Sequence, residues 1–354
     1  MKFLSGLIAV CLAGGAISAQ SESISAQEAA RARQSLQSTQ WIDKAWGAYF
    51  AGRLHSDQMR EPLIEQFRAS EVLRDAMSGS EEHAYMLVLF DAAIESDITV
   101  PAELLQPFEE NWAAPVLILL ARDKDSEDSL LRLSVEKSPD IVWLTASNLL
   151  AERNSQRWYT GLLGSVNIAH RFTVFDPGTG AGTGGATGGG VYGDGGAAMP
   201  KGFPPVTIYA LRTGCMPGSV LLAQGPENVC YQRTVVPTDK QVGFGAGHTS
   251  FKRDDMRGGY LAQLANMTSS EVRSILHPET TLEFHGIDAI RQSMEQGLDA
   301  QEEDIRALLQ KIANRGLEVP TGVHLQVVPE VIDQRSDRSE ALPPLAPREI
   351  QLTR

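Results

Sequence analysis

The spacing of apolar residues changes character near Gly164, and this change most constrains the fold. Between about Ala26 and Gly164 apolar residues recur every three or four positions, which predicts helices. Beyond Gly164 short segments alternate between apolar and polar residues, which predicts strands. The expected fold class is therefore multidomain α+β: a helical repeat domain over 26–164, then a smaller α+β domain over 165–335 with an antiparallel sheet.

The clearest helical signal is a pair of short helices over residues 40–67. In the first helix Ala45, Ala48, Tyr49 and Gly52 recur at helical spacing and form a face of mostly small residues, which lets a neighbouring helix approach closely. Ser56-Asp57 is expected to cap the second helix. An apolar stripe on that second helix is formed by Pro62, Leu63, Ile64 and Phe67.

Three weaker copies of this pattern follow, over residues 84–108, 113–135 and 141–163. Each has an apolar helix, a polar turn with Asp or Asn, and a second helix, at spacings that drift from about 40 to about 28 residues. Over the N-terminal half only, the pattern resembles the HEAT and armadillo-type helical repeats of an exported bacterial protein.

The resemblance implies stacked helix pairs with a concave surface that binds proteins or peptides. Trp46 and Tyr49 flank the small-residue face and are the candidate partner-binding residues, since exposed aromatic side chains dominate binding energies. The alternative is an ordinary helical domain whose surface binds nothing.

The second half of the chain predicts strands and helices of mixed order. Four strands should pair in one sheet, at 170–175, 206–211, 220–222 and 229–231. A further strand–helix–strand unit should pack on that sheet. The expected elements are a helix at 255–266, a strand at 280–286, a long helix at 287–314 and a strand at 323–328. Because the segment 336–354 is polar and rich in proline, it is expected to be a disordered tail.

A glycine-rich segment, 178–196, separates the first two predicted strands. Part of it matches the dinucleotide-binding fingerprint, but no helix is expected to follow and hold a pyrophosphate. Another part resembles a single calcium-binding nonapeptide, which needs stacked copies to form an ion site. The segment is interpreted as a flexible connection, and no cofactor is expected.

The first nineteen residues predict a secretory signal peptide, because Lys2 precedes a short apolar run and small residues end at Ala19. The expected location is the periplasm or the cell exterior. No segment reaches the roughly twenty apolar residues of a membrane span, so stable membrane insertion is not expected. The net charge of -13 disfavours nucleic acid as a partner.

Without the signal peptide two cysteines remain, Cys215 and Cys230, which favours a disulfide in an oxidising compartment. A simple meander would place them roughly 15–20 Å apart, whereas a bridge needs Cα atoms within about 7 Å. Either the 213–218 segment folds back or the strands are ordered differently.

No sequence pattern assembles a catalytic or metal site. The usual zinc and nucleophile motifs are missing, and His277, Glu279, Glu283 and His285 supply too few ligands on one face. His248, beside Thr249 and Ser250, has no evident partner. The sequence therefore favours a non-enzymatic scaffold that binds a protein or peptide. The alternative is a secreted hydrolase or a small-ligand-binding protein with its site between the domains, near His170 or His285.

Overall fold

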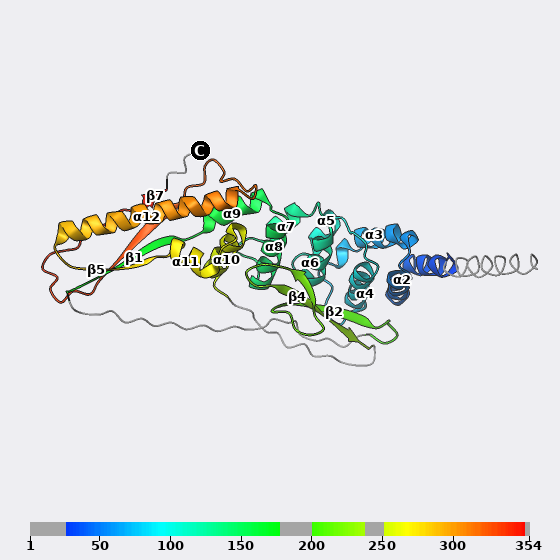
Figure 1. Ribbon diagram of the computed structural model, residues 1–354. Helices are drawn as coiled ribbons and strands as arrows, with labels where there is room; N and C mark the ends of the chain where they lie inside the picture. The colour runs from blue at the N-terminus through cyan, green and yellow to red at the C-terminus, as the bar shows by residue number, and fades with distance from the viewer. Residues whose placement is uncertain (1–25, 178–199, 238–250, 351–354) are drawn as a thin grey trace, which may run out of the picture. The chain divides into compact units, whose positions relative to one another are not determined.

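The computed structural model describes residues 26–177, 200–237 and 251–350 (Figure 1). The predicted signal peptide 1–19, the glycine-rich segment 178–196 and His248 lie outside these residues. The described chain divides into two compact units. One contains residues 26–145, 200–222 and 230–237, and the other contains residues 146–177, 223–229 and 251–350. The domain boundary predicted near residue 165 stays a prediction.

Helices occupy all four predicted pairs. A first helix covers residues 26–36. It is followed by α2 (Trp41–Leu54), α3 (Arg60–Ala69), α4 (Glu81–Glu95), α5 (Ala102–Leu105), α6 (Ala113–Arg122), α7 (Glu127–Leu133), α8 (Asp140–Glu152) and α9 (Gln156–Ser165). Short 3-10 turns flank them at Asp57–Met59, Glu71–Leu73 and Gln106–Phe108. The Ser56 side chain accepts from the Gln58 amide, so the predicted cap is confirmed one short turn before α3.

The small-residue face of α2 packs closely on α4. Ala45 and Ala48 are fully buried, and a Cβ atom placed on Gly52 would lie 2.7 Å from the Ala92 Cα. Three phenylalanines, Phe67, Phe90 and Phe108, meet edge to face in the core of this unit. The prediction that the small residues Ala45, Ala48 and Gly52 are buried is therefore confirmed, whereas Tyr49 is only half-buried.

In the described part of the chain seven strands form two sheets, and the α+β fold class is confirmed. The strands are β1 (Ile168–Phe175), β2 (Val206–Thr213), β3 (Val220–Ala223), β4 (Val229–Val236), β5 (Glu279–Glu283), β6 (Gln326–Asp333) and β7 (Arg348–Glu349). One sheet has the order β5-β1-β6-β7 and the other, which is antiparallel, the order β2-β4-β3.

The prediction that 170–175 pairs with the strands at 206–231 is wrong. Strand β1 instead pairs in parallel with β5 and β6. The remaining helices are α10 (Arg253–Ala265), α11 (Ser269–Leu276) and α12 (Ile287–Ala313). Strands β5 and β6 lie on either side of β1 and run parallel to it, and α12 forms the crossover that parallel strands consecutive in sequence need. The sequence shows the periodicity of each strand but not which strands pair, so it does not predict the pairing of β1 with β5 and β6.

The predicted limits of the last strand and of the tail also need correction. Strand β6 starts and ends later than predicted, and it includes Pro329, which normally ends a strand pattern. Residues 336–350 are not a free tail: β7 pairs antiparallel with β6, and Ile350 is buried while its amide donates to the Leu325 carbonyl. The burial of Ile350 and the pairing of β7 therefore outweigh the polar, proline-rich composition of this segment.

Among the described residues, none of the helices combines the length and the apolar character that crossing a bilayer requires.

Candidate functional site

Three aromatic side chains gather on the part of α2 opposite its buried face. The Trp46 ring is stacked on Phe50 with ring centroids 5.5 Å apart, and Tyr49 meets both rings edge-on. Phe50 is 51% exposed, whereas Trp46 and Tyr49 are half-buried. We call Trp46, Tyr49 and Phe50 the aromatic cluster. Its helical spacing of three and four residues brings the rings together on one side.

Trp46 is held in place by a segment far away in sequence. Its indole Nε1 donates a hydrogen bond of 2.8 Å to the Gly202 carbonyl oxygen. Gly202 has a φ of +86°, and a Cβ atom there would lie 2.8 Å from the Ile42 Cδ1, so the segment passes tightly over α2. Trp46 therefore forms the edge of the cluster rather than its most exposed part, and Phe50 has that position.

A charged group adjoins the cluster at the end of α2. The guanidinium carbon of Arg53 lies 3.5 Å from the centre of the Tyr49 ring, a cation–π contact. Its Nη2 atom lies 3.6 Å from the Asp91 Oδ2, and Arg233 approaches the other oxygen of that carboxylate at 3.8 Å. Arg53 thus joins the aromatic rings to an ionic group.

Asp91 is the buried centre of this ionic group, with 1% of its side chain exposed. The Tyr209 hydroxyl donates to Asp91 Oδ1 over 2.8 Å, while Oδ2 has no hydrogen-bond partner among the described residues. Burial, and then the Asp91 charge, raise the pKa of Tyr209 far above its ordinary value, so the phenol stays protonated and remains a donor. Arg233 is held in turn by Glu95 at 2.6 Å.

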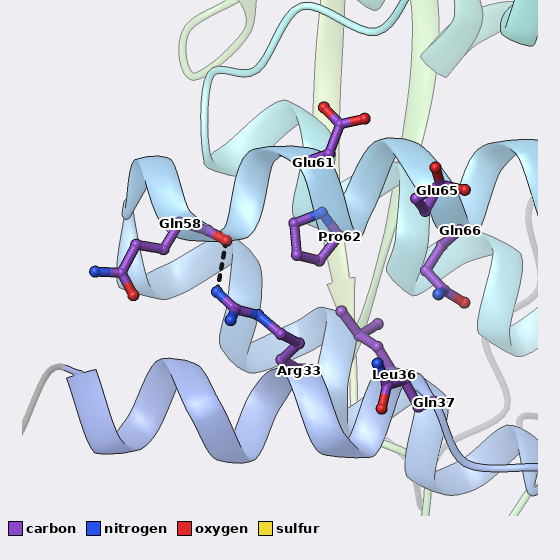
Figure 2. A pocket seen from close by; sticks show the side chains of 8 residues that line it. All are labelled: Arg33, Leu36, Gln37, Gln58, Glu61, Pro62, Glu65 and Gln66. Atoms are coloured by element: carbon purple, nitrogen blue, oxygen red, sulfur yellow. Dashed lines mark hydrogen bonds between the residues drawn. The ribbon is translucent and has the colours of Figure 1, made fainter.

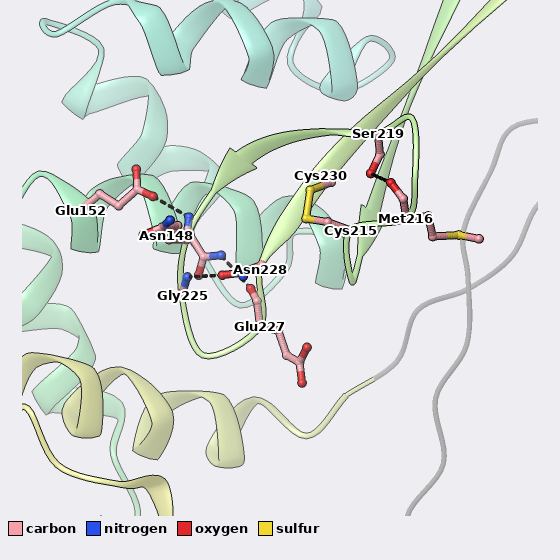
Figure 3. The surroundings of a disulfide bond; sticks show 10 residues. Asn148, Glu152, Cys215, Met216, Ser219, Gly225, Glu227, Asn228 and Cys230 are labelled. Atoms are coloured by element: carbon pink, nitrogen blue, oxygen red, sulfur yellow. Dashed lines mark hydrogen bonds between the residues drawn. A yellow bond between two sulfur atoms is a disulfide. The ribbon is translucent and has the colours of Figure 1, made fainter.

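The predicted cysteine pair joins the turn after β2 to the start of β4 (Figure 3). Cys215 and Cys230 form a disulfide with Cα atoms 5.4 Å apart. The strand order explains the distance: β4 lies directly beside β2, so the start of β4 is next to the end of β2. The second of the two predicted arrangements, a different strand order, is therefore confirmed.

His170 and His285, the residues proposed for an enzyme site, have different surroundings. His170 is buried and stacked on Phe172 at 4.0 Å, with Nδ1 bonded to Gln301 and Nε2 to Thr280. Both ring nitrogens are therefore in use within the core. His285 is exposed on the surface, 3.4 Å from Glu283. Within the described ranges, no three His, Cys, Asp or Glu side chains are arranged to hold a metal ion.

An open hollow of about 410 Å³ lies between the first helix and α3 (Figure 2). Leu36 and Pro62 form its apolar part, and Arg33 spans one side by donating to the Gln58 carbonyl at 3.1 Å. Glu61 and Glu65 lie on the α3 side with Gln66. The polar side chains of the hollow lie on the surface and form no acid–base or nucleophile–base pair. The hollow therefore has no arrangement of groups that could catalyse a reaction.

Comparison of the chain with protein-family models, with curated proteins and with solved structures gives no match. The similarity to HEAT and armadillo-type repeats therefore depends on the residue pattern alone and stays a prediction.

Proposed function

We propose that the chain is a non-enzymatic scaffold that binds a protein or peptide in the periplasm or outside the cell. The observation that carries this proposal is the aromatic cluster on α2. Phe50 exposes half of a large apolar ring beside Trp46, Tyr49 and the Arg53 guanidinium, a combination enriched at protein interfaces.

The chemistry of the cluster suits a partner with an apolar side chain next to a carboxylate. The apolar side chain would cover Phe50, while Arg53 would offer its donors to the carboxylate. Because Asp91 and Tyr49 already fix the position of Arg53, little side-chain entropy would be lost on binding.

The expected location rests on the predicted signal peptide, and the Cys215–Cys230 disulfide supports it because disulfides persist in oxidising compartments.

The test is site-specific photo-crosslinking in the producing cell, with a photoreactive amino acid at position 50. We expect one dominant crosslinked partner from the envelope, and we expect Tyr49→Ala or Arg53→Ala to reduce its yield. The matched control is position 72, since Val72 is also an exposed apolar residue, on another part of the same unit. Equal crosslinking from both positions, or none from position 50, would contradict the proposal.

A further inference from the structure

We propose that the face of the β5-β1-β6 sheet not covered by α12 is a second docking surface, and that it binds a basic amphipathic helix of a partner protein.

The two faces of strand β1 differ strongly in burial. Ile168, His170, Phe172 and Val174 of β1 are all buried. They face α12, because a Cβ atom on its Gly297 would lie 3.0 Å from the Phe172 ring. Since side chains alternate along a strand, Arg171, Thr173 and Phe175 point to the opposite face.

The register extends this opposite face over three strands. Arg171 pairs with Glu279 on one side and Glu330 on the other, so the three form a charged row across the sheet. Ion pairs of 2.9 Å and 3.2 Å hold that row. Val328 and Ile332 lie on either side of it along β6, each 41% exposed. We call this surface the open face. It consists of Arg171, Thr173 and Phe175 of β1, Glu279, Thr281 and Glu283 of β5, and Val328, Glu330 and Ile332 of β6.

A helix is the element that normally covers such a surface. Parallel sheets are almost always covered on both sides by helices, because their crossovers place helices there. Here the exposure of Val328 and Ile332 shows that no element among the described residues covers the second side. Three strands about 4.8 Å apart and about five residues long make a surface of roughly 10 by 16 Å, which fits one helix of about three turns.

The negative charge of the open face favours a basic helix as the partner. Three carboxylates, Glu279, Glu283 and Glu330, face one guanidinium, Arg171, which gives a net charge of -3 + 1 = -2. A second copy of the chain would bring two negative faces together, so self-association is disfavoured. The chain's own segment 178–196 contains no lysine or arginine and is rich in glycine, and so it lacks the composition of such a helix.

The test uses the full mature protein and a labelled synthetic peptide of about 14 residues, long enough for three helical turns plus ends. The peptide carries a leucine stripe flanked by lysines, and a second peptide has glutamate in place of every lysine. In fluorescence anisotropy titrations we expect the lysine peptide to bind at least about tenfold more tightly, with affinity falling as salt rises.

Site variants separate the open face from general attraction to an acidic chain. Ile332→Asp should weaken binding of the lysine peptide by at least about tenfold. The matched control is Val235→Asp, since Val235 is exposed on the other sheet, and it should leave binding unchanged. The double variant Glu283→Lys, Glu330→Lys should reverse the preference toward the glutamate peptide, with circular dichroism confirming that each variant is folded.

Equal binding of the lysine peptide to Ile332→Asp and to the unaltered protein would overturn the proposal. No binding of either peptide would overturn it as well. A concentration-dependent dimer that Ile332→Asp abolishes would show that a second copy covers the open face instead.

Discussion

At the scale of single residues, close backbone contact explains why α2 carries small side chains. Gly52 allows α2 to approach Ala92, and the side chains on the other side of α2 remain free to form the aromatic cluster. The sequence predicted both the small-residue face and the aromatic side chains beside it. It could not show that the Gly202 carbonyl covers the Trp46 edge, because that contact joins residues 156 positions apart. Phe50 was missed for this reason, although its spacing of four from Trp46 was a usable signal.

Gly52→Ala should destabilise the protein by roughly 1–3 kcal/mol, because the added methyl group would clash with the Ala92 backbone. The matched control is Gly161→Ala in α9, where a Cβ atom meets nothing within 4 Å. It should instead stabilise by up to about 1 kcal/mol through helix propensity. Urea unfolding of both variants measures the difference, and a destabilising Gly161→Ala or a neutral Gly52→Ala would contradict this account.

The stability of the protein should fall as the pH falls below about 6.5, the ordinary histidine value. Burial lowers the pKa of His170, although its bond to Gln301 opposes this, and burial followed by the charge of Arg273 lowers the pKa of His277. Below that pH the unfolded chain binds protons that the folded chain excludes, so the free energy of unfolding decreases.

His170→Gln should flatten this dependence in part, since glutamine cannot be protonated and His277 remains. The measurement is the free energy of unfolding between about pH 5 and about pH 7, compared with the unaltered protein. Parallel curves for the two proteins would show that His170 does not contribute.

At the scale of elements, the helix pairs were predictable and the sheets were not. Each helix shows its own periodicity and its own stop, as at Ser56 before α3. The sequence of β1 shows only that one side of the strand is buried. The same alternation of apolar and polar residues would also suit a strand of an antiparallel hairpin. Its parallel partners lie more than one hundred residues away, so pairing depends on contacts that no local pattern encodes.

The disulfide should stabilise its unit by roughly 3 kcal/mol, the value for a closed loop of about fifteen residues. The double variant Cys215→Ser, Cys230→Ala should therefore unfold at lower denaturant concentration than the oxidised protein. Reduction of the unaltered protein provides the control and should shift the midpoint by a similar amount. A midpoint that reduction does not change would show that the bridge adds no stability.

The C-terminal segment protects the outer edge of β6. Arg338 Nη2 donates to the Asp333 carbonyl over 2.9 Å, and the Ser336 amide donates to Asp176 over 2.7 Å. Pro329 also has no amide hydrogen to offer at that edge. Exposed strand edges pair with other chains, so these features together limit aggregation.

Deletion of residues 336–354 should cost roughly 2–4 kcal/mol of stability, because it exposes the site of Ile350 and breaks these hydrogen bonds. It should also cause association that increases with concentration, measured by light scattering. Deletion of 351–354 alone is the control, since it keeps Ile350 and the β7 pairing. If both deletions behave alike, the segment 336–350 does not contribute to the unit.

At the scale of the whole molecule, the chain passes between its two units more than once. Residues 146–177 belong to one unit, residues 200–222 to the other, and residues 223–229 to the first of these again. The periodicity of the sequence gave no sign of this exchange, because a helix or strand has the same pattern in whichever unit it packs.

The predicted signal peptide implies a particular N-terminus for the mature chain. Mass spectrometry of the protein from its native cell should place the first residue near Gln20, since the small residues before it are typical of signal peptidase sites. Recovery of a chain that begins at Met1 from the cytoplasm would contradict the predicted location and would remove the argument for an oxidising compartment.

The hydrogen bond between Tyr209 and Asp91 can form only late in the synthesis of the chain. Its two ends are 118 residues apart, so about 6 to 24 s of synthesis separate them at roughly 5–20 residues per second. During that interval the Asp91 carboxylate lacks the Tyr209 hydroxyl as a donor, so the final surroundings of α4 are not yet complete. A unit whose core includes this bond therefore stays incomplete until Tyr209 has been made, when more than half of the 354 residues have been synthesised.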